Sequence, residues 1–158
     1  MNDDGKQYVL FHVGSEEYGL PIANVSSIIR YETATPVPRA PASVQGVIDL
    51  RGRVVPVVDL GKRLFGTTLD PTGHARIIVT ETSAGAVGLA VDAASEVATF
   101  KPDQMMAAPE AAIPREMVDA FEAIVHVEGR LVILLDLERV LPRAEYELTG
   151  TETSEGDA

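Results

Sequence analysis

The chain of 158 residues contains no cysteine, few aromatic residues and no long apolar run. Without cysteine, disulfide and thiolate–metal chemistry are excluded, and nothing argues for an oxidising compartment. No apolar run approaches the roughly 20 residues that span a bilayer. The chain has no charged segment followed by an apolar segment, the pattern that would predict a secretory signal. These absences favour a cytoplasmic protein.

Positive charge is also scarce, because the net charge is −11. Nucleic-acid binding requires a basic surface, and stacking on bases requires exposed aromatic side chains, which make up only 5% of this chain. Residues 30–63 differ, with six Arg or Lys against three Asp or Glu. This segment is either a set of solvated strand edges or a docking face for an acidic partner. The alternative function that it leaves open is a small-barrel nucleic-acid-binding protein.

The sequence contains an internal repeat, which must be identified before the fold is assigned. GRVVPVVDL (52–60) matches GRLVILLDL (129–137) at an offset of 77 residues, and GLPIANVSSI (19–28) matches GLAVDAASEV (88–97) at an offset of 69. Both halves therefore carry the same order of parts. The repeat predicts two similar units, with the function between or across them.

Short apolar runs separated by Gly and Pro turns predict small barrels or sandwiches. The strands are expected at 8–13, 18–22, 25–31, 45–50, 53–58, 76–81, 86–91, 96–100, 124–127 and 130–135. Two connectors, 35–41 and 101–114, and a helical turn near 116–121 separate them. No helical pattern of 10–15 residues alternates with the strands, which disfavours a parallel α/β fold.

The motifs of common enzymes are missing as well. The chain has neither G-x-S-x-G nor a complete phosphate-binding loop, and its three histidines lack the spacing of metal ligands. The best acid–base candidates are four aspartates: Asp49, Asp59, Asp92 and Asp136. Asp59 and Asp136 occupy equivalent repeat positions and are predicted to cap short helices. A hydrolase that uses Asp49 or Asp92 is a further alternative, with no base or nucleophile to name.

The run PVPRAPASVQGVIDLRGRVVPVVDL (36–60) resembles the signature of the CheW-like chemotaxis coupling domain. The resemblance covers 7–141 and implies one all-β domain of two SH3-like five-stranded barrels around a shared hydrophobic core, with short helices. The first barrel would lie mainly in 18–66 and the second in 76–135, with the termini crossing between them. The acidic remainder, 142–158, is typical of a disordered tail.

The resemblance implies a non-enzymatic adaptor without a cofactor or metal. Such proteins couple the cytoplasmic tip of methyl-accepting chemoreceptors to the regulatory domain of a CheA-like histidine kinase, and are recruited to membrane-associated receptor arrays. Carried over by position, the receptor-binding residues are Val25, Gly46, Arg51, Ala94 and Val97. A weaker kinase contact is expected at Met106, Glu110 and Ala111, because the family's usual Arg and aromatic residue are replaced there.

Two departures from the family pattern affect Arg51. Asp49 stands where Asn is usual, and Ser27 stands where many members have a Glu that can pair with the signature Arg. Arg51 would then pair either with Asp49 or with a receptor carboxylate, and the sequence leaves both possibilities open.

Overall fold

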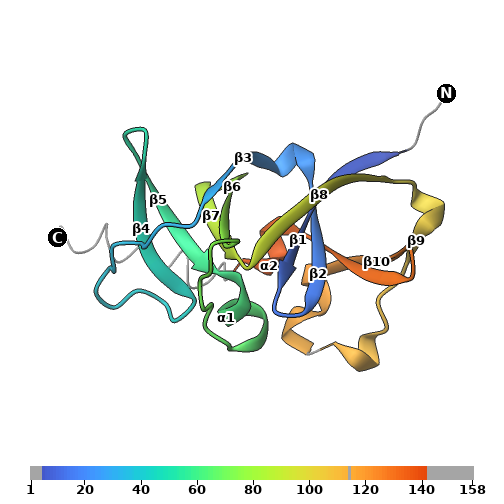
Figure 1. The fold of residues 1–158 in the computed structure, drawn as a ribbon. Helices are drawn as coiled ribbons and strands as arrows, with labels where there is room; N and C mark the ends of the chain where they lie inside the picture. Colours follow the sequence, from blue (N-terminus) through green and yellow to red (C-terminus); the bar gives the residue numbers. More distant parts are fainter. Residues whose placement is uncertain (1–4, 114, 142–158) are drawn as a thin grey trace.

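The computed structural model describes residues 5–113 and 115–141, which form a mostly β fold with short helices (Figure 1). The strands are β1 (Lys6–Val13), β2 (Glu16–Pro21), β3 (Val25–Arg30), β4 (Val44–Leu50), β5 (Arg53–Asp59), β6 (Arg76–Thr82), β7 (Gly85–Val91), β8 (Ala93–Phe100), β9 (Met105–Met106), β10 (Phe121–Val127) and β11 (Arg130–Leu135). The α-helices are α1 (Leu60–Phe65) and α2 (Leu137–Val140), and the 3-10 helices are η1 (Ile22–Asn24), η2 (Pro102–Gln104), η3 (Glu110–Ala112) and η4 (Arg115–Ala120).

These strands make two sheets. The six-stranded sheet has the order β8-β1-β2-β11-β10-β9, and the five-stranded sheet has the order β3-β6-β7-β5-β4. The expected ten strands are all present, and the two-residue β9 adds an eleventh. The all-β prediction is confirmed, with one sheet a strand larger than expected.

The distribution of strands between the sheets differs from the expected split into 18–66 and 76–135. The five-stranded sheet takes β6 and β7 from the second half, and the six-stranded sheet takes β1 and β2 from the first half. Each sheet thus combines the hairpin of one repeat copy with the later strands of the other. The strands of different copies are joined by parallel pairing, since β5 pairs with β7 and β11 pairs with β2.

The registers of those parallel pairs repeat along the chain. Val57 lies opposite Gly88, and Leu134 lies opposite Gly19. Leu134 follows Val57 by 77 residues and Gly88 follows Gly19 by 69, so both contacts join equivalent repeat positions. The repeat in the sequence is therefore a repeat in the fold.

A shared core lies between the two sheets, and each sheet encloses a smaller core of its own. Phe11 and Tyr18 stack within the shared core at a ring-centroid distance of 6.2 Å. Burying aromatic and aliphatic side chains of this size stabilises a fold by about 1.5–3 kcal/mol each. Successive residues of a strand face different cores, as Phe11 faces the shared core and Leu10 the core of its own sheet, which explains the apolar runs of the sequence.

Both predicted helix caps are confirmed. The Asp59 side chain accepts a hydrogen bond from Lys62 N at 3.1 Å, and the Asp136 side chain accepts one from Arg139 N at 3.2 Å. A carboxylate at this position satisfies an amide that has no partner within the helix. The first helix ends at Gly66, which takes the left-handed conformation.

Candidate functional site

The edge strands β3 and β8 carry matching β-bulges. In β3 the bulge falls at Ser26, between Val25 opposite Thr80 and Ser27 opposite Val79. In β8 it falls at Ser95, the equivalent residue. The Ser26 hydroxyl donates to Val79 O at 3.1 Å, and the Ser95 hydroxyl donates to Leu10 O, also at 3.1 Å.

These bulges decide which side chains share a face. Residues three apart on a regular strand point to opposite faces, but an extra residue between them restores the same face. Val25 and Ile28 therefore lie on one side of β3, opposite Thr80 and Ile78. Ala94 and Val97 lie on one side of β8, opposite Phe11 and Val9.

The four side chains Val25, Ile28, Ala94 and Val97 make what we call the edge-strand surface. Val25 packs against the shared core that contains Phe11 and Ile78, whereas Ile28 is 41% exposed and Val97 is 50% exposed. Ile28 and Val97 occupy equivalent repeat positions. Exposed aliphatic side chains at both sheet edges are suited to contact with another protein.

The sequence prediction included Val25, Ala94 and Val97 but missed Ile28. The signal for Ile28 was present, because an offset of 69 residues carries Ile28 onto Val97. Ile28 was missed because the sequence alone suggests a core residue in a regular strand. The bulge that brings Ile28 to the same face as Val25 has no distinct sequence pattern here.

Gly46 lies in a different environment from the edge-strand surface. It is buried with φ +148°, and a Cβ atom built on it would lie 2.1 Å from Thr35 O. The backbone of Thr35 bridges to Val47 through Thr35 N to Val47 O at 2.8 Å and Val47 N to Thr35 O at 2.9 Å. Glycine is needed here so that residues 35–36 can cross β4 closely. Gly46 thus has a structural role, and it offers no exposed surface to a partner.

Arg51 lies at the tip of the β4–β5 hairpin, which projects away from β8 (Figure 1). Arg51 has φ +55° and Gly52 has φ +88°, and these angles form the tight turn favoured in two-residue hairpins. Asp49 Oδ1 accepts a hydrogen bond from Gly52 N at 2.9 Å. Arg51 is exposed and has no ion pair or hydrogen bond within the described residues. Asp49 therefore stabilises the turn, and Arg51 is free to meet a carboxylate of another molecule.

The equivalent hairpin of the second copy has the same backbone and different charges. Glu128 has φ +50° and Gly129 has φ +83°. Beside them, Arg130 Nε contacts Glu17 Oε1 at 2.6 Å and Arg130 Nη2 contacts Glu96 Oε2 at 2.7 Å. The hydrogen bond that Arg130 donates to Glu17, together with the charges of both glutamates, raises the pKa of Arg130. Arg130, the cation beside the second turn, therefore has its ion-pair partners within the fold.

The residues expected at the kinase contact lie at the other end of the molecule from Arg51. Met106 is 46% exposed on β9, the outer edge of the six-stranded sheet, where it pairs with Ile124. Ala111 is exposed in η3. Glu110 belongs to the same helix, and its side chain lies outside the described residues. Figure 1 shows β9 opposite the β4–β5 hairpin.

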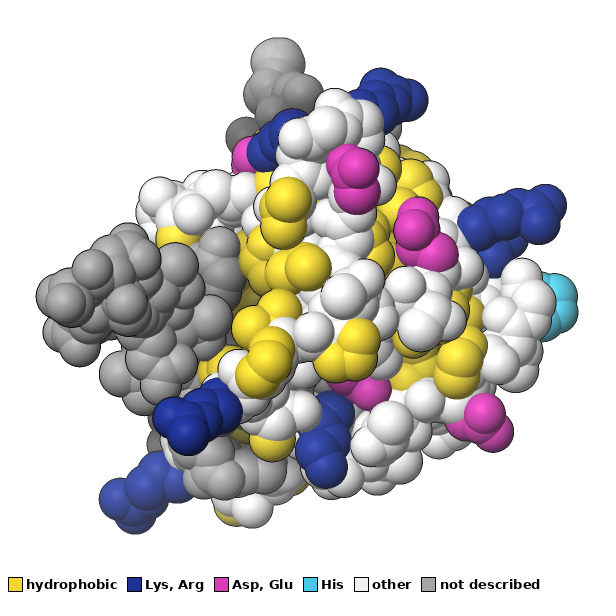
Figure 2. Space-filling view, turned by 90° about the vertical axis from the view of Figure 1, so that its left-hand side faces the viewer, with side chains coloured by type: hydrophobic (Ala, Val, Ile, Leu, Met, Phe, Trp, Pro, Cys, Tyr) yellow, Lys and Arg dark blue, Asp and Glu magenta, His cyan; other side chains and the backbone are white. Residues whose placement is uncertain are grey.

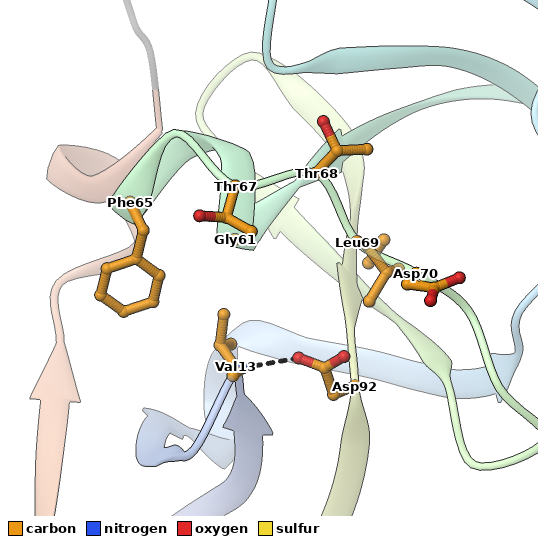
Figure 3. A pocket seen from close by; sticks show the side chains of 10 residues that line it. Val13, Gly61, Phe65, Thr67, Thr68, Leu69, Asp70 and Asp92 are labelled. Atoms are coloured by element: carbon orange, nitrogen blue, oxygen red, sulfur yellow. Dashed lines mark hydrogen bonds between the residues drawn. The ribbon is translucent and has the colours of Figure 1, made fainter.

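All four candidate acid–base carboxylates have structural partners. Besides the two helix caps and Asp49, Asp92 Oδ2 accepts a hydrogen bond from Gly14 N at 2.6 Å. Asp92 lines a cavity of about 210 Å³ with Val13, Phe65 and Leu69, in which the aliphatic and phenyl groups form the wall (Figure 3). Within the described residues, no group of three or more His, Cys, Asp or Glu side chains is arranged to hold a metal.

Comparison with known proteins identifies the family. The model of the CheW-like domain matches residues 7–145. The chain belongs to the CheW-like family. The chemotaxis protein CheW of Rhizobium meliloti (strain 1021) is 37% identical over 147 residues, covering 93% of this chain and 94% of that protein. The chemotaxis protein CheW of Bacillus subtilis (strain 168) is 34% identical over 139 residues, 88% of each chain.

The fold of this CheW-like chain agrees with a solved relative. The scaffolding protein TtCheW from Thermoanaerobacter tengcongensis superimposes with a TM-score of 0.77 at 29% identity, covering 86% of this chain and 87% of that one. Family membership makes the chain a chemotaxis scaffold or adaptor and not an enzyme, as the resemblance predicted. The nucleic-acid and hydrolase alternatives gain no support. In the described part of the chain, no helix is long and apolar enough to cross a membrane.

Proposed function

We propose that this CheW-like protein couples the cytoplasmic tip of chemoreceptors to the regulatory domain of a CheA-like histidine kinase, in the cytoplasm at receptor arrays. The observation that carries the proposal is the family match over 7–145, nearly the whole described chain. A scaffold needs separate surfaces for separate partners. The edge-strand surface and the Met106 edge are separate apolar surfaces of this kind.

The receptor is assigned to the edge-strand surface. The receptor tip is a helical hairpin, and an amphipathic helix presents aliphatic side chains to an apolar surface. Ile28 and Val97 provide two exposed aliphatic side chains from the two sheets, with Val25 and Ala94 beside them. Arg51 is assigned to a carboxylate outside the chain, since Asp49 is engaged by Gly52 N.

The kinase is assigned to the β9 edge with Met106 and Ala111, together with Glu110. Met106 offers an exposed, adaptable side chain on a sheet edge, and such side chains suit protein contacts.

The test measures binding of two fragments, a receptor-tip hairpin and a kinase regulatory domain, by calorimetry. Val97→Ser should weaken receptor binding by about tenfold and leave kinase binding unchanged, because a contact residue at the centre of an interface contributes about 1–2 kcal/mol. Met106→Ser should do the reverse. Leu131→Ser is the matched control, since Leu131 is 52% exposed outside both surfaces.

The outcomes separate the parts of the proposal. Failure of the unmodified protein to bind either fragment contradicts the adaptor function. Binding of both fragments with no effect of Val97→Ser removes the edge-strand surface from the receptor site. Arg51→Ala should weaken receptor binding with no change in thermal stability, and an unchanged receptor affinity removes Arg51 from the site.

A further inference from the structure

The outer part of the β4–β5 hairpin exposes an apolar strip, which we define as Val47, Pro56 and Val54. Val47 lies opposite Pro56, and the next pair on the same face is Asp49 opposite Val54. Val54 is 71% exposed, and Val47 and Pro56 are half-buried. Figure 2 views the molecule from the side of β4 and β5, and apolar side chains gather along the middle of this face.

The strip continues directly from the shared core. Towards the base of the hairpin, Val58 follows Pro56 on the same face of β5 and is buried in the shared core. Leu141, the last described residue, is buried in that same core. Val140 O, one residue earlier, accepts a hydrogen bond from Arg63 Nε at 2.8 Å. The described chain therefore ends in the same core as Val58 and beside α1, the helix that directly follows β5.

The segment that follows has the length and side chains to cover the strip. Val58 lies four residue steps along the strand from Val54, a distance of about 13 Å. The seven residues of 142–148 span up to about 23 Å when extended. They include Tyr146 and Leu148, which alternate with Glu145 and Glu147. In an extended chain, such alternation places apolar side chains on one face and carboxylates on the other.

The arginines near the two ends of the strip are opposite in charge to the acidic segment. Arg51 is unpaired among the described residues at the tip, and Arg63 lies at the base. Residues 142–158 hold five Asp or Glu against one Arg, within a chain of net charge −11. Most of this acidic protein repels such a segment, so an apolar strip between two arginines is the favoured contact. Asp49 shares the face, and its carboxylate is engaged by Gly52 N.

We propose that residues 142–158 of this chain dock on the strip. Tyr146 and Leu148 cover Val54 and Pro56, and the flanking glutamates face Arg51 and Arg63. The docked segment shields an exposed apolar face in the free protein, and a partner that binds this face must displace it. This inference concerns the strip alone and does not depend on the receptor or kinase assignments.

The absence of cysteine allows a clean test by NMR, since Gly150→Cys creates a single position for a nitroxide spin label. In ¹⁵N-labelled protein, the amides of Val47, Arg51 and Val54 should lose intensity by about twofold or more, as expected for a docked state that predominates. The double variant Tyr146→Ser/Leu148→Ser should remove the effect. The matched control Thr149→Ser/Thr151→Ser should retain it.

Each other outcome contradicts the proposal. Uniformly weak broadening means that the segment does not dock, and broadening at Ile28 and Val97 means that it docks on the edge-strand surface. Broadening of ¹⁵N protein by spin-labelled ¹⁴N protein means that the occupant is a second copy. All substitutions lie outside the described fold, so loss of folding does not confuse the result. Added salt should weaken the broadening by screening the glutamates.

Discussion

The close backbone contact at Gly46 gives a sharp prediction for Gly46→Ala. The new methyl group would lie 2.1 Å from Thr35 O and 2.6 Å from Thr35 C, both backbone atoms. Relief of this overlap requires residues 35–36 to move away from β4. The two backbone hydrogen bonds between Thr35 and Val47 are then lost.

The magnitude follows from those contacts. Loss of two hydrogen bonds costs about 1 kcal/mol each. A non-glycine residue at φ +148° adds strain of about 1–3 kcal/mol. The free energy of unfolding should fall by about 3–5 kcal/mol, which for a chain of this size lowers Tm by roughly 6–20 °C.

Thermal and urea unfolding followed by circular dichroism measure the effect. Gly52→Ala is the matched control, since Gly52 also has positive φ but a Cβ there meets nothing within 4 Å. Its cost should be about 1 kcal/mol, from backbone strain alone. A Gly46→Ala protein as stable as the Gly52→Ala protein would refute the reasoning. If it also lost receptor binding, Gly46 would be a contact residue rather than a structural one.

Three further predictions concern buried groups. Asp59 accepts bonds from Lys62 N and from Leu69 N at 2.8 Å, so Asp59→Ala should cost about 2–4 kcal/mol in urea unfolding, and Asp136→Ala, which loses one cap, about 1 kcal/mol. Arg130→Ala should lower Tm more than Arg53→Ala, because Arg130 pairs with the buried Glu17 whereas Arg53 makes one exposed pair with Glu81; equal shifts would contradict this. Burial, and then the charge of Glu16, raises the pKa of Tyr18. Its stabilising contribution is therefore complete below the unfolded pKa of about 10 and is lost as pH rises above it. Tyr18→Phe should reduce that slope, and the remainder should come from Tyr8, whose pKa burial also raises. Near-ultraviolet phenolate absorbance should show Tyr18 ionising at higher pH in the folded protein than in the unfolded chain.

The sequence predicted the elements of this fold well because local signals define them. Short apolar runs mark the strands, and Gly52 and Gly129 mark equivalent turns. Asp59 and Asp136 occupy the cap position that short helices require. Each of these features depends on neighbours in the sequence, so a repeat of the sequence was sufficient to reveal a repeat of the structure.

The pairing between the two halves could not be predicted in the same way. A hairpin such as β1–β2 specifies its own partner strands, but nothing local specifies that β2 lies beside β11 or β7 beside β5. That choice depends on which exchange buries the shared core. The bulges at Ser26 and Ser95 were missed for the same reason, and Ile28 was missed with them.

The hairpin turns of the two repeat copies share a backbone conformation and differ in the charges that they carry. The turns at Arg51-Gly52 and Glu128-Gly129 have nearly the same positive φ angles, so neither side chain is required by its turn. In the second copy, Glu17, Glu96 and Glu128 surround Arg130, and this network closes within the protein. In the first copy, the equivalent of Arg130 is Arg53, which pairs with the exposed Glu81 at 3.3 Å, and Ser27 stands at the position of Glu96. Arg51, the equivalent of Glu128, has no partner among the described residues. Since an unpaired exposed arginine adds nothing to folding, the first hairpin presents a charge that only another segment or molecule can satisfy, and the strip beside it supplies the apolar contact.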